Sequence, residues 1–234
     1  SEKFNKPTPA EIAYWGGYFF YHNRLHRNYQ DDISLHYYLL ASKDGITIGK
    51  RYFKHENNKE DYPFSPSGHN LYDNNSKLYY CRDFDNIVYQ IHEDSVVPRF
   101  RINLPNPLPA SMIEERPNEM SLLRSGYSLG ITDIYEYGGL LFFRFVKDGY
   151  IWSCLYNVEE SKQVYCAKRI KFLDSSLIDT IDGIYKDCFY SILTPEYLDY
   201  AFSENPLEDY PDLFKTYDVE GDNPVIAFYR AVVR

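Results

Sequence analysis

The sequence predicts an all-β fold. Short aromatic-rich runs of strand length recur along the chain, turn residues separate them, and few segments carry the periodicity of a helix. The chain holds 25 Tyr, 15 Phe and 2 Trp, so that 18% of its residues are aromatic, and 44% are hydrophobic. This composition excludes a disordered polymer, and 234 residues are enough to bury a sizeable core.

The clearest repeat lies in the middle of the chain. Four predicted strands, with turns at Gly138-Gly139 and Lys147-Asp148-Gly149, cover Ile131–Tyr135, Leu140–Val146, Tyr150–Tyr156 and Gln163–Ile170. Such short turns join antiparallel neighbours, so this segment predicts a four-stranded meander. The second of these strands begins Leu-Leu-Phe-Phe and is apolar on both faces, as expected for a sheet that lies between two other sheets.

Other copies of this unit precede and follow it. One has predicted strands at Asn70–Tyr72, Leu78–Arg82, Ile87–Ile91 and Val96–Leu104; an earlier one has Tyr18–His22, Leu35–Ala41, a Lys43-Asp44-Gly45 turn and Ile46–Phe53; the last begins with Ile181–Tyr185 and Cys188–Leu193. The aligned second strands, at Phe19, Tyr79, Leu141 and Phe189, are 60, 62 and 48 residues apart. This spacing predicts a β-propeller with about four four-stranded blades in the chain.

Two stretches interrupt the repeat. Pro105–Pro117 is predicted to be a long connection between blades, with one helical turn at Ala110–Glu115. Short helices are predicted near the C-terminus, where Thr194 caps a helix from Pro195 to Phe202 and where Pro206–Tyr217 adds another. A final strand, Pro224–Val233, is expected to complete a blade that the other end of the chain begins, although Phe4–Tyr14 shows no strong strand alternation.

Charge and hydropathy restrict the partners of this chain. It carries 25 Lys and Arg against 34 Asp and Glu, a net charge of −9, which is the wrong sign for binding nucleic acid. The longest dense apolar patch, Leu140–Phe145, is far shorter than the roughly 18 residues of a membrane span. Ser1–Thr8 is polar and contains no signal peptide or lipidation motif, so any membrane association is expected to need a lipid anchor absent from this sequence.

No local motif predicts catalysis, a cofactor or a metal site. His22 and His26 would lie about 13 Å apart along a strand, too far to share an ion. Four adjacent carboxylate pairs lie in predicted turns or loops and are expected to be solvated charges, namely Asp31-Asp32, Glu114-Glu115, Glu159-Glu160 and Glu208-Asp209. Asp83–Asn86 and Asp218–Asp222 resemble calcium loops only loosely, and a tight turn explains Asp83–Asn86. Nucleotide-binding glycine motifs and nucleophile elbows are absent from the sequence.

Two of the four cysteines are placed symmetrically about Glu160. A hairpin centred there would put Cys154 opposite Cys166, within reach of a disulfide if the register is right. Two small buried thiols are the alternative.

Four aromatic residues are candidates for ligand binding. Trp15, Tyr62, Phe64 and Tyr127 each lie in a connection rich in Gly, Pro or Ser, near a predicted blade junction where propeller ligand sites usually form. If exposed, these rings would stack on sugars or pack against another protein. The alternative is that each ring anchors its own loop.

Three segments resemble a known family in their order along the chain. Asn86–Ile91, Val96–Ile102 and Asp222–Tyr229 resemble the six-bladed β-propeller lipoproteins of Bacteroides-like bacteria. The family usually has Asp-Thr-Ile-Tyr where this chain has Asn86–Tyr89, and an end like Tyr-x-Ile-Asp-Phe where it has Phe100, Ile102, Asn103 and Leu104. The resemblance covers the C-terminal two-thirds of a typical member. It implies one propeller domain over residues 1–234 that is part of a six-bladed ring and lacks two N-terminal blades and the lipid-anchored leader.

Three functional hypotheses follow from these observations. The resemblance favours a non-catalytic lipoprotein of the cell envelope, anchored to the outer membrane and either exposed at the surface or periplasmic. It would act as a protein-interaction subunit of an outer-membrane complex, in association with a nutrient importer. The alternatives are a module that binds a glycan or peptide through its loop aromatics, and a propeller lyase or hydrolase whose carboxylates converge from different blades.

Overall fold

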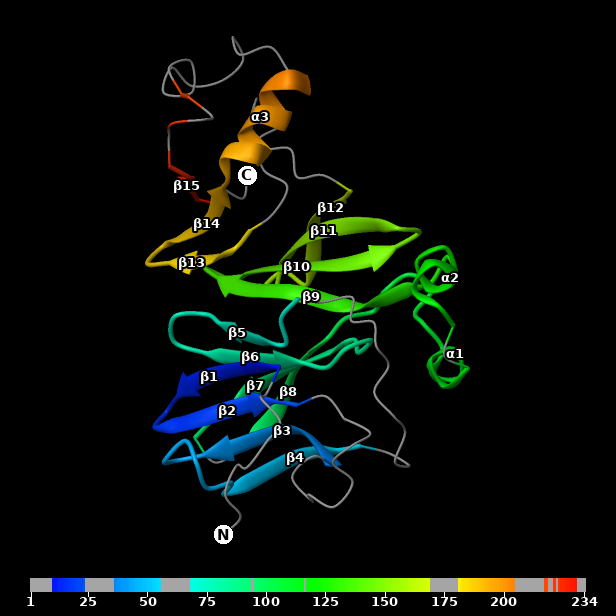
Figure 1. Ribbon diagram of the computed structural model, residues 1–234, viewed down its shortest axis with the longest axis vertical. Coiled ribbons are helices and arrows are strands. Elements are labelled where there is room, and N and C mark those ends of the chain that lie inside the picture. Colours follow the sequence, from blue (N-terminus) through cyan, green and yellow to red (C-terminus); the bar gives the residue numbers. More distant parts are fainter. Residues whose placement is uncertain are drawn as a thin grey trace. The chain divides into compact units, whose positions relative to one another are not determined.

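The protein is described by a computed structural model in which four antiparallel sheets follow one another along the chain (Figure 1). The structure describes residues 10–23, 36–55, 68–93, 95–115, 117–168, 181–204, 217–218, 221 and 223–230. Residue packing divides the chain into two compact units, Ser1–Ile134 with Phe145–Tyr150, and Tyr135–Arg144 with Ile151–Arg234. The expected single domain over residues 1–234 remains a prediction.

Three sheets have four strands each, as the repeat predicts. The first contains β1 (Glu11–Trp15), β2 (Tyr18–His22), β3 (Tyr37–Ser42) and β4 (Lys50–Lys54), and the second contains β5 (Leu71–Asp73), β6 (Leu78–Cys81), β7 (Ile87–Ile91) and β8 (Val96–Arg101). The third contains β9 (Ser128–Tyr137), β10 (Leu140–Lys147), β11 (Tyr150–Asn157) and β12 (Lys162–Ala167). In each sheet the strands lie side by side in chain order.

The fourth sheet has three strands among the described residues: β13 (Gly183–Tyr185), β14 (Cys188–Leu193) and β15 (Val225–Tyr229). The expected pairing of the last strand with the other end of the chain is wrong. Instead β15 pairs with β14, from Phe189 opposite Tyr229 to Leu193 opposite Val225. The segment between them contains α3 (Pro195–Glu204), and this excursion allows the chain to return antiparallel beside β14.

The strand β1 was not predicted, because Phe4–Tyr14 shows no strong strand alternation in the sequence. Glu11 to Trp15 pair with His22 to Tyr18 in register. Ile12 and Tyr14 are exposed, whereas Ala13 and Trp15 on the other face are half-buried against the shared core. Glu11 also links the first two sheets, since its carboxylate accepts hydrogen bonds from the backbone N–H groups of Asn70 (2.6 Å) and Leu71 (2.9 Å).

The helices are short and lie between strands. The predicted turn of helix is confirmed as α1 (Ala110–Glu114), and the predicted C-terminal helix is confirmed as α3, where the Thr194 hydroxyl accepts from the N–H of Tyr197 at 3.3 Å. A further helix, α2 (Glu119–Leu123), carries no strong sequence signal. The predicted helix at Pro206–Tyr217 falls almost entirely outside the described residues.

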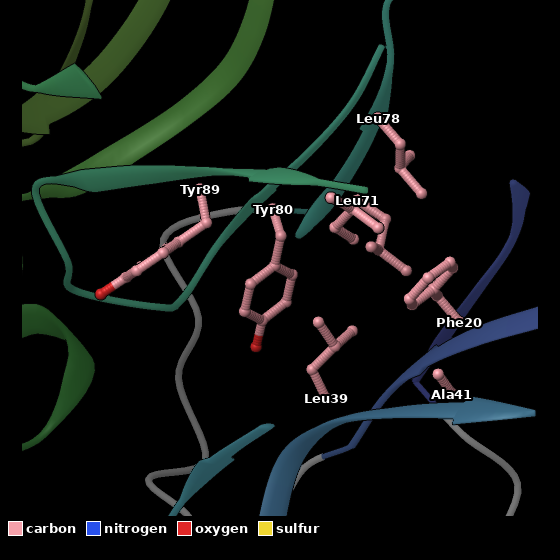
Figure 2. Close-up of a cluster of buried hydrophobic side chains, with 8 residues drawn as sticks. Phe20, Leu39, Ala41, Leu71, Leu78, Tyr80 and Tyr89 are labelled. Carbon is pink, nitrogen blue, oxygen red and sulfur yellow. The ribbon is translucent and has the colours of Figure 1, made fainter. Parts of the chain in front are cut away.

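The first two sheets share one buried core. Figure 2 shows Phe20, Leu39 and Ala41 from the first sheet facing Leu71, Leu78, Tyr80 and Tyr89 from the second. Six of these seven side chains are at most 7% exposed, and Tyr89 is 8% exposed. Aromatic residues therefore fill the space between adjacent sheets, which anchors the strand ends that form the site described next.

Candidate functional site

The two ends of the strands in the first two sheets differ in the length of the connections found there. In an antiparallel meander, the turns after the first and third strands lie at one end of the sheet. The connections after the second and fourth strands lie at the opposite end. The first kind is short, at residues 16–17, 43–49, 74–77 and 92–95. The second kind includes residues 23–36, 55–70 and 102–127, and we call this end of the sheets the long-connection end. Longer connections supply more side chains to a site.

At the long-connection end, the turn between β6 and β7 is built around Asp85. One carboxylate oxygen, Oδ2, accepts from Arg82 Nε at 2.9 Å and from Arg82 Nη2 at 2.6 Å. The other, Oδ1, accepts from the backbone N–H of Asn86 at 2.7 Å and of Ile87 at 3.1 Å. The prediction that a tight turn accounts for Asp83–Asn86 is confirmed, because all four bonds hold the loop and its arginine.

Beside this turn lies a cleft of about 210 Å³, which we call the Arg82 cleft. It is lined by Tyr38, Arg82, Asp83, Phe84, Asp85 and Ile113. These residues come from β3, from the β6–β7 turn and from α1, so three separate segments of the chain build it. Phe84 has a φ of 60°. It packs so closely against Gly130 that a Cβ added to Gly130 would lie 2.7 Å from the Cα of Phe84.

Aromatic rings support Arg82 from behind the cleft. Its guanidinium carbon lies 5.3 Å from the ring centroid of Phe53 and 5.9 Å from that of Tyr38, within the range of cation–π attraction. Burial by itself would lower the pKa of Arg82, but its ion pair with Asp85 raises it above the ordinary value. The guanidinium is therefore charged, and its direction is fixed.

Below Tyr38 lies a buried histidine. The ring of His55 packs against Tyr38 at an interplanar angle of 40°, with 3.6 Å between centroids, and the residue is only 7% exposed. Its Nε2 is buried and has no hydrogen-bond partner among the described residues. Burial, followed by the charges of His22, His36 and Arg82, lowers the pKa of His55 to about 4. At neutral pH this imidazole is uncharged.

A second histidine contacts the core of the two sheets. His22 Nδ1 lies 3.1 Å from the hydroxyl of Tyr80, and both side chains are buried. Burial raises the pKa of Tyr80 well above its ordinary value, so the phenol stays protonated. This pair continues the polar layer of His55 and Arg82 into the shared core.

The structure describes two of the four predicted ligand-binding aromatics. Trp15 is a strand residue at the end of β1, not the loop residue that the sequence predicts, and it packs half-buried on the shared core of the first two sheets. Tyr127 precedes β9 at the long-connection end and packs half-buried on Leu122, Leu129 and Val146. Neither lines the Arg82 cleft. Tyr62 and Phe64 lie outside the described residues, and a role of all four in ligand binding remains a prediction.

Sequence reasoning missed the residues that line the cleft. Tyr38, Arg82 and Ile113 are far apart in the chain, and no local motif joins them. The one usable signal was the Asp83–Asn86 turn, which located a tight loop without indicating its partners. Sites that several segments assemble leave no spacing to recognise.

The second unit has a cavity of about 240 Å³ lined by Tyr137, Gly138, Leu140, Asp187 and Arg230. Arg230 Nη2 and Asp187 Oδ2 are 2.6 Å apart, but the two side chains are 71% and 52% exposed. Water screens such a pair, which makes this cavity a weaker candidate than the Arg82 cleft.

The hairpin of β11 and β12 places Cys154 opposite Cys166, as the sequence predicts, and the two form a disulfide with a Cα separation of 4.1 Å. Among the described residues, no three His, Cys, Asp or Glu side chains gather as a metal site requires. None of the helices that the structure describes is long and apolar enough to span a membrane.

Comparison with known proteins gives two matches and one negative result. A family model described as 6-bladed beta-propeller matches residues 12–176. A crystal structure of a Bacteroides fragilis protein predicted to be exported matches with a TM-score of 0.68 and 17% identity, over 90% of this chain and 61% of that one. The chain thus spans less than two thirds of that protein. No curated protein matches.

Proposed function

The chain belongs to the 6-bladed β-propeller family, and from that premise we propose that it is a non-catalytic binding protein of the cell envelope that holds a partner protein at the Arg82 cleft. The three four-stranded sheets, which apart from Glu11 lie within the matched residues 12–176, are blades of that fold. The propeller fold by itself specifies no reaction, so the proposal depends on the chemistry of the cleft.

The observation that carries this proposal is the state of Asp85. All four of its hydrogen bonds hold the turn and Arg82. Asp83 is also engaged, since its Oδ1 accepts from Asn70 Nδ2 at 3.1 Å. A glycoside hydrolase needs two carboxylates available on either side of the bond it cleaves, and these two are committed to the fold. This carboxylate pair therefore does not support a hydrolase site at the Arg82 cleft.

What remains at the surface of the cleft suits a protein ligand. A fixed guanidinium, two aromatic rings and the aliphatic side chain of Ile113 surround a small hollow. Arginine and aromatic residues are enriched where protein interfaces gain most of their binding energy, and a hollow of this size accepts one large side chain. A partner residue with an apolar body and a carbonyl near its end would fit Tyr38, Phe84 and Arg82, whereas a carboxylate would meet Asp83 and Asp85.

Two observations support a location in the cell envelope. Disulfides persist in oxidising compartments, and Cys154 and Cys166 form one. The crystal structure that matches this fold belongs to a protein predicted to be exported. Outer-membrane anchoring through a lipid, and membership of an outer-membrane complex such as a nutrient importer, are the finer parts of the proposal and come from the family resemblance.

The test is capture of a partner by matched surface variants. The purified chain would be immobilised and exposed to detergent-solubilised envelope of the producing bacterium, and bound proteins would be identified by mass spectrometry. Ile113→Glu places a charge in the cleft, whereas Met120→Glu places the same charge on an exposed side chain of α2 outside it. We expect one stoichiometric partner for the wild type and for Met120→Glu, and its loss from Ile113→Glu. Equal capture by both variants would remove the cleft from the interface.

A glycan is the second candidate ligand, because Tyr38 and Phe84 line the cleft beside charged groups. Aromatic faces with nearby hydrogen-bonding side chains suit a sugar ring. The same two variants on a glycan array separate the candidates. Sugar binding that Ile113→Glu abolishes, without a captured protein, would favour the glycan.

A further inference from the structure

We propose that Lys43 and Lys50 bind an oxyanion between their ammonium groups, beside the ring of Tyr18. The ligand is a phosphate, sulfate or carboxylate group, either free or carried by a larger molecule. The three residues belong to the first sheet and lie at the end of its strands opposite the long-connection end. The proposal is therefore independent of the Arg82 cleft and of the function proposed for that cleft.

The first observation is that two lysines meet at one aromatic ring. Tyr18 begins β2, Lys43 lies in the turn between β3 and β4, and Lys50 begins β4, so three positions in the chain converge at one end of the sheet (Figure 1). Each Nζ lies 5.2 Å from the centroid of the Tyr18 ring. The two Nζ atoms are therefore at most twice that distance apart, and like charges at this separation repel each other.

The second observation concerns the partners of these two ammonium groups. Among the described residues, no salt bridge pairs either of them with a carboxylate. The Nζ of Lys50 donates instead to the backbone carbonyl of Glu93, at 3.4 Å. The chain has 34 acidic residues against 25 basic ones, so carboxylates are not in short supply. Two neighbouring cations without a counter-charge attract an anion.

The carboxylate next to Lys43 in the sequence is committed to its own turn. The Oδ1 atom of Asp44 accepts from the Ser42 hydroxyl at 2.9 Å and from the backbone N–H groups of Ile46 and Thr47 at 2.8 and 2.6 Å. The bonds from Thr47 and Ile46 hold the pKa of Asp44 well below its ordinary value. This carboxylate stays ionised, and its hydrogen bonds hold the turn and not the lysine.

The other acidic side chain near the pair is that of Glu93. It lies against the β1–β2 turn, where a Cβ added to Gly16 would be 3.1 Å from the Glu93 Cγ. Its backbone carbonyl accepts from Lys50, but within the described structure its carboxylate forms no ion pair with that lysine. An anion at the lysine pair thus competes with no carboxylate already bound there.

The third observation is that the parts of the site are held in place by the fold. Tyr18 packs half-buried on the core that the first two sheets share. The Tyr21 hydroxyl donates to the Gly45 carbonyl at 2.8 Å and so fixes the turn that carries Lys43. The pairing of β3 with β4 fixes the backbone of Lys50. A site whose parts are ordered before the ligand arrives loses less conformational entropy on binding.

The chemistry of the two side chains defines the ligand. A lysine ammonium is a compact charge with three donors, and it binds phosphate and carboxylate oxygens without the planar match that arginine requires. The face of Tyr18 attracts both ammonium groups and keeps them at one place. An oxyanion between them removes their mutual repulsion, and a dianion such as phosphate gains more from two positive charges than a monoanion does.

The test is a titration of the ¹⁵N-labelled full chain with sodium phosphate, followed by nuclear magnetic resonance at low ionic strength. We expect saturable shifts of the backbone amides around residues 43–50 with a single Kd. Lys43→Gln and Lys50→Gln should each raise that Kd at least about fivefold. Lys54→Gln removes the same charge from an exposed position at the other end of β4 and should change the Kd less than about twofold.

A second pair of variants examines the ring. Tyr18→Phe keeps the aromatic face, and we expect phosphate binding to remain. Tyr18→Leu removes the attraction that holds both ammonium groups, and it should raise the Kd at least about threefold. Circular dichroism would verify that both variants are folded.

Two further probes separate the sources of the oxyanion. Glucuronate carries a carboxylate on a sugar ring, and acetate carries one without a sugar. Glucuronate that binds more tightly than both acetate and phosphate would identify an acidic sugar as the carrier. Phosphate that binds most tightly would identify a free or esterified phosphate. Either order supports the lysine pair as the site, provided that Lys50→Gln weakens the binding.

Three results would overturn the proposal. The first is a lack of saturable shifts around residues 43–50 with all three anions. The second is an equal loss of binding in Lys54→Gln and Lys50→Gln, because general charge attraction would then account for it. The third is phosphate binding that neither Lys43→Gln nor Lys50→Gln weakens.

Discussion

The second strands of the second and fourth sheets have similar apolar sequences and different surroundings. In β6, Leu78-Tyr79-Tyr80-Cys81 is buried on both faces. In β14, burial alternates along Cys188–Leu193, so that Phe189, Ser191 and Leu193 are buried while Ile192 on the other face is 46% exposed. The strand repeat therefore specifies a blade, whereas the neighbours of each blade decide whether one face or both are buried.

The cores of the two sheets differ in the same way. On the second sheet, Leu71, Leu78, Tyr80 and Tyr89 pack against residues of the first sheet. On the fourth sheet, Leu193 packs against Leu198 and Ala201 of α3, and this smaller cluster covers one face only. A helix thus covers part of the fourth sheet where a neighbouring sheet covers the second.

The largest expected contrast comes from two phenylalanines. Phe20 is fully buried in the core shared by the first two sheets, whereas Phe228 is 54% exposed on β15. Phe20→Ala should lower the free energy of unfolding by about 4 kcal/mol, because it removes apolar contacts and leaves a cavity. Phe228→Ala should cost less than about 1 kcal/mol, because its exposed side chain loses few contacts. Denaturant unfolding of both variants measures this contrast, and equal losses would mean that the face of the fourth sheet is buried.

The second contrast is in the response to acid. All six histidines lie at or before residue 92, so the fourth sheet has none. The pKa of His55 is about 4 in the folded chain, below its ordinary value of 6.5. As the pH falls from 6.5 to 4, the unfolded chain therefore binds a proton that the folded chain does not, and folding loses up to about 3 kcal/mol. Below pH 4 this histidine contributes no further loss.

The variant His55→Phe isolates this effect, because it keeps a ring against Tyr38 and removes the titrating group. Stability measured at several pH values should fall less steeply between pH 6.5 and 4 in the variant than in the wild type. An identical slope in both proteins would show that His55 titrates normally in the folded chain.

The third contrast concerns two glycines with close neighbours. Gly130 has a φ of +100°, and an added Cβ would lie 2.7 Å from the backbone of Phe84. Gly183 meets only the ring of Tyr190, also at about 2.6 Å. Gly130→Ala should cost about 2 kcal/mol, because backbone cannot move aside, and Gly183→Ala about 1 kcal/mol, because a half-exposed ring can rotate away. Thermal unfolding of the two variants ranks them, and the reverse order would contradict this account.

Much of the fold could be predicted from local sequence. Two glycine-containing turns, Gly138-Gly139 and Lys147-Asp148-Gly149, are typical of tight β-hairpins. The strands β10 and β11 begin at Leu140 and Tyr150, as these turns predict. The Thr194-Pro195 signal located the start of α3. Glu11–Trp15 escaped prediction because its apolar residues lie on both faces, so the period-two pattern that identifies a half-buried strand is missing.

The partner of the last strand could not be predicted. The Val-Ile-Ala-Phe-Tyr run identified β15 as a strand, but strand propensity does not say which edge it joins. Pairing with β14 depends on the return of the chain after α3. The Cys154–Cys166 pair is an intermediate case, because symmetry about Glu160 suggested it. A register shift between Leu155 and Tyr156 places the two residues opposite each other across a four-residue turn.

The candidate site divides in the same way. The turn at Asp83–Asn86 follows from residues that bond to their own backbone, as Asp85 does with Asn86 and Ile87. The cleft around it required Tyr38 from one sheet and Ile113 from a later connection, and the neutral state of His55 required its burial under Tyr38.

The blades can be predicted from the amino-acid sequence, which indicates the strands, most of their turns and the apolar character of their faces. These depend on interactions between residues close in the chain, and such interactions leave a periodic pattern. The three-dimensional fold sets which strand faces are covered, which distant strands pair and which distant side chains share a cleft. Those outcomes depend on contacts between segments that are far apart in the sequence, and no local spacing records them.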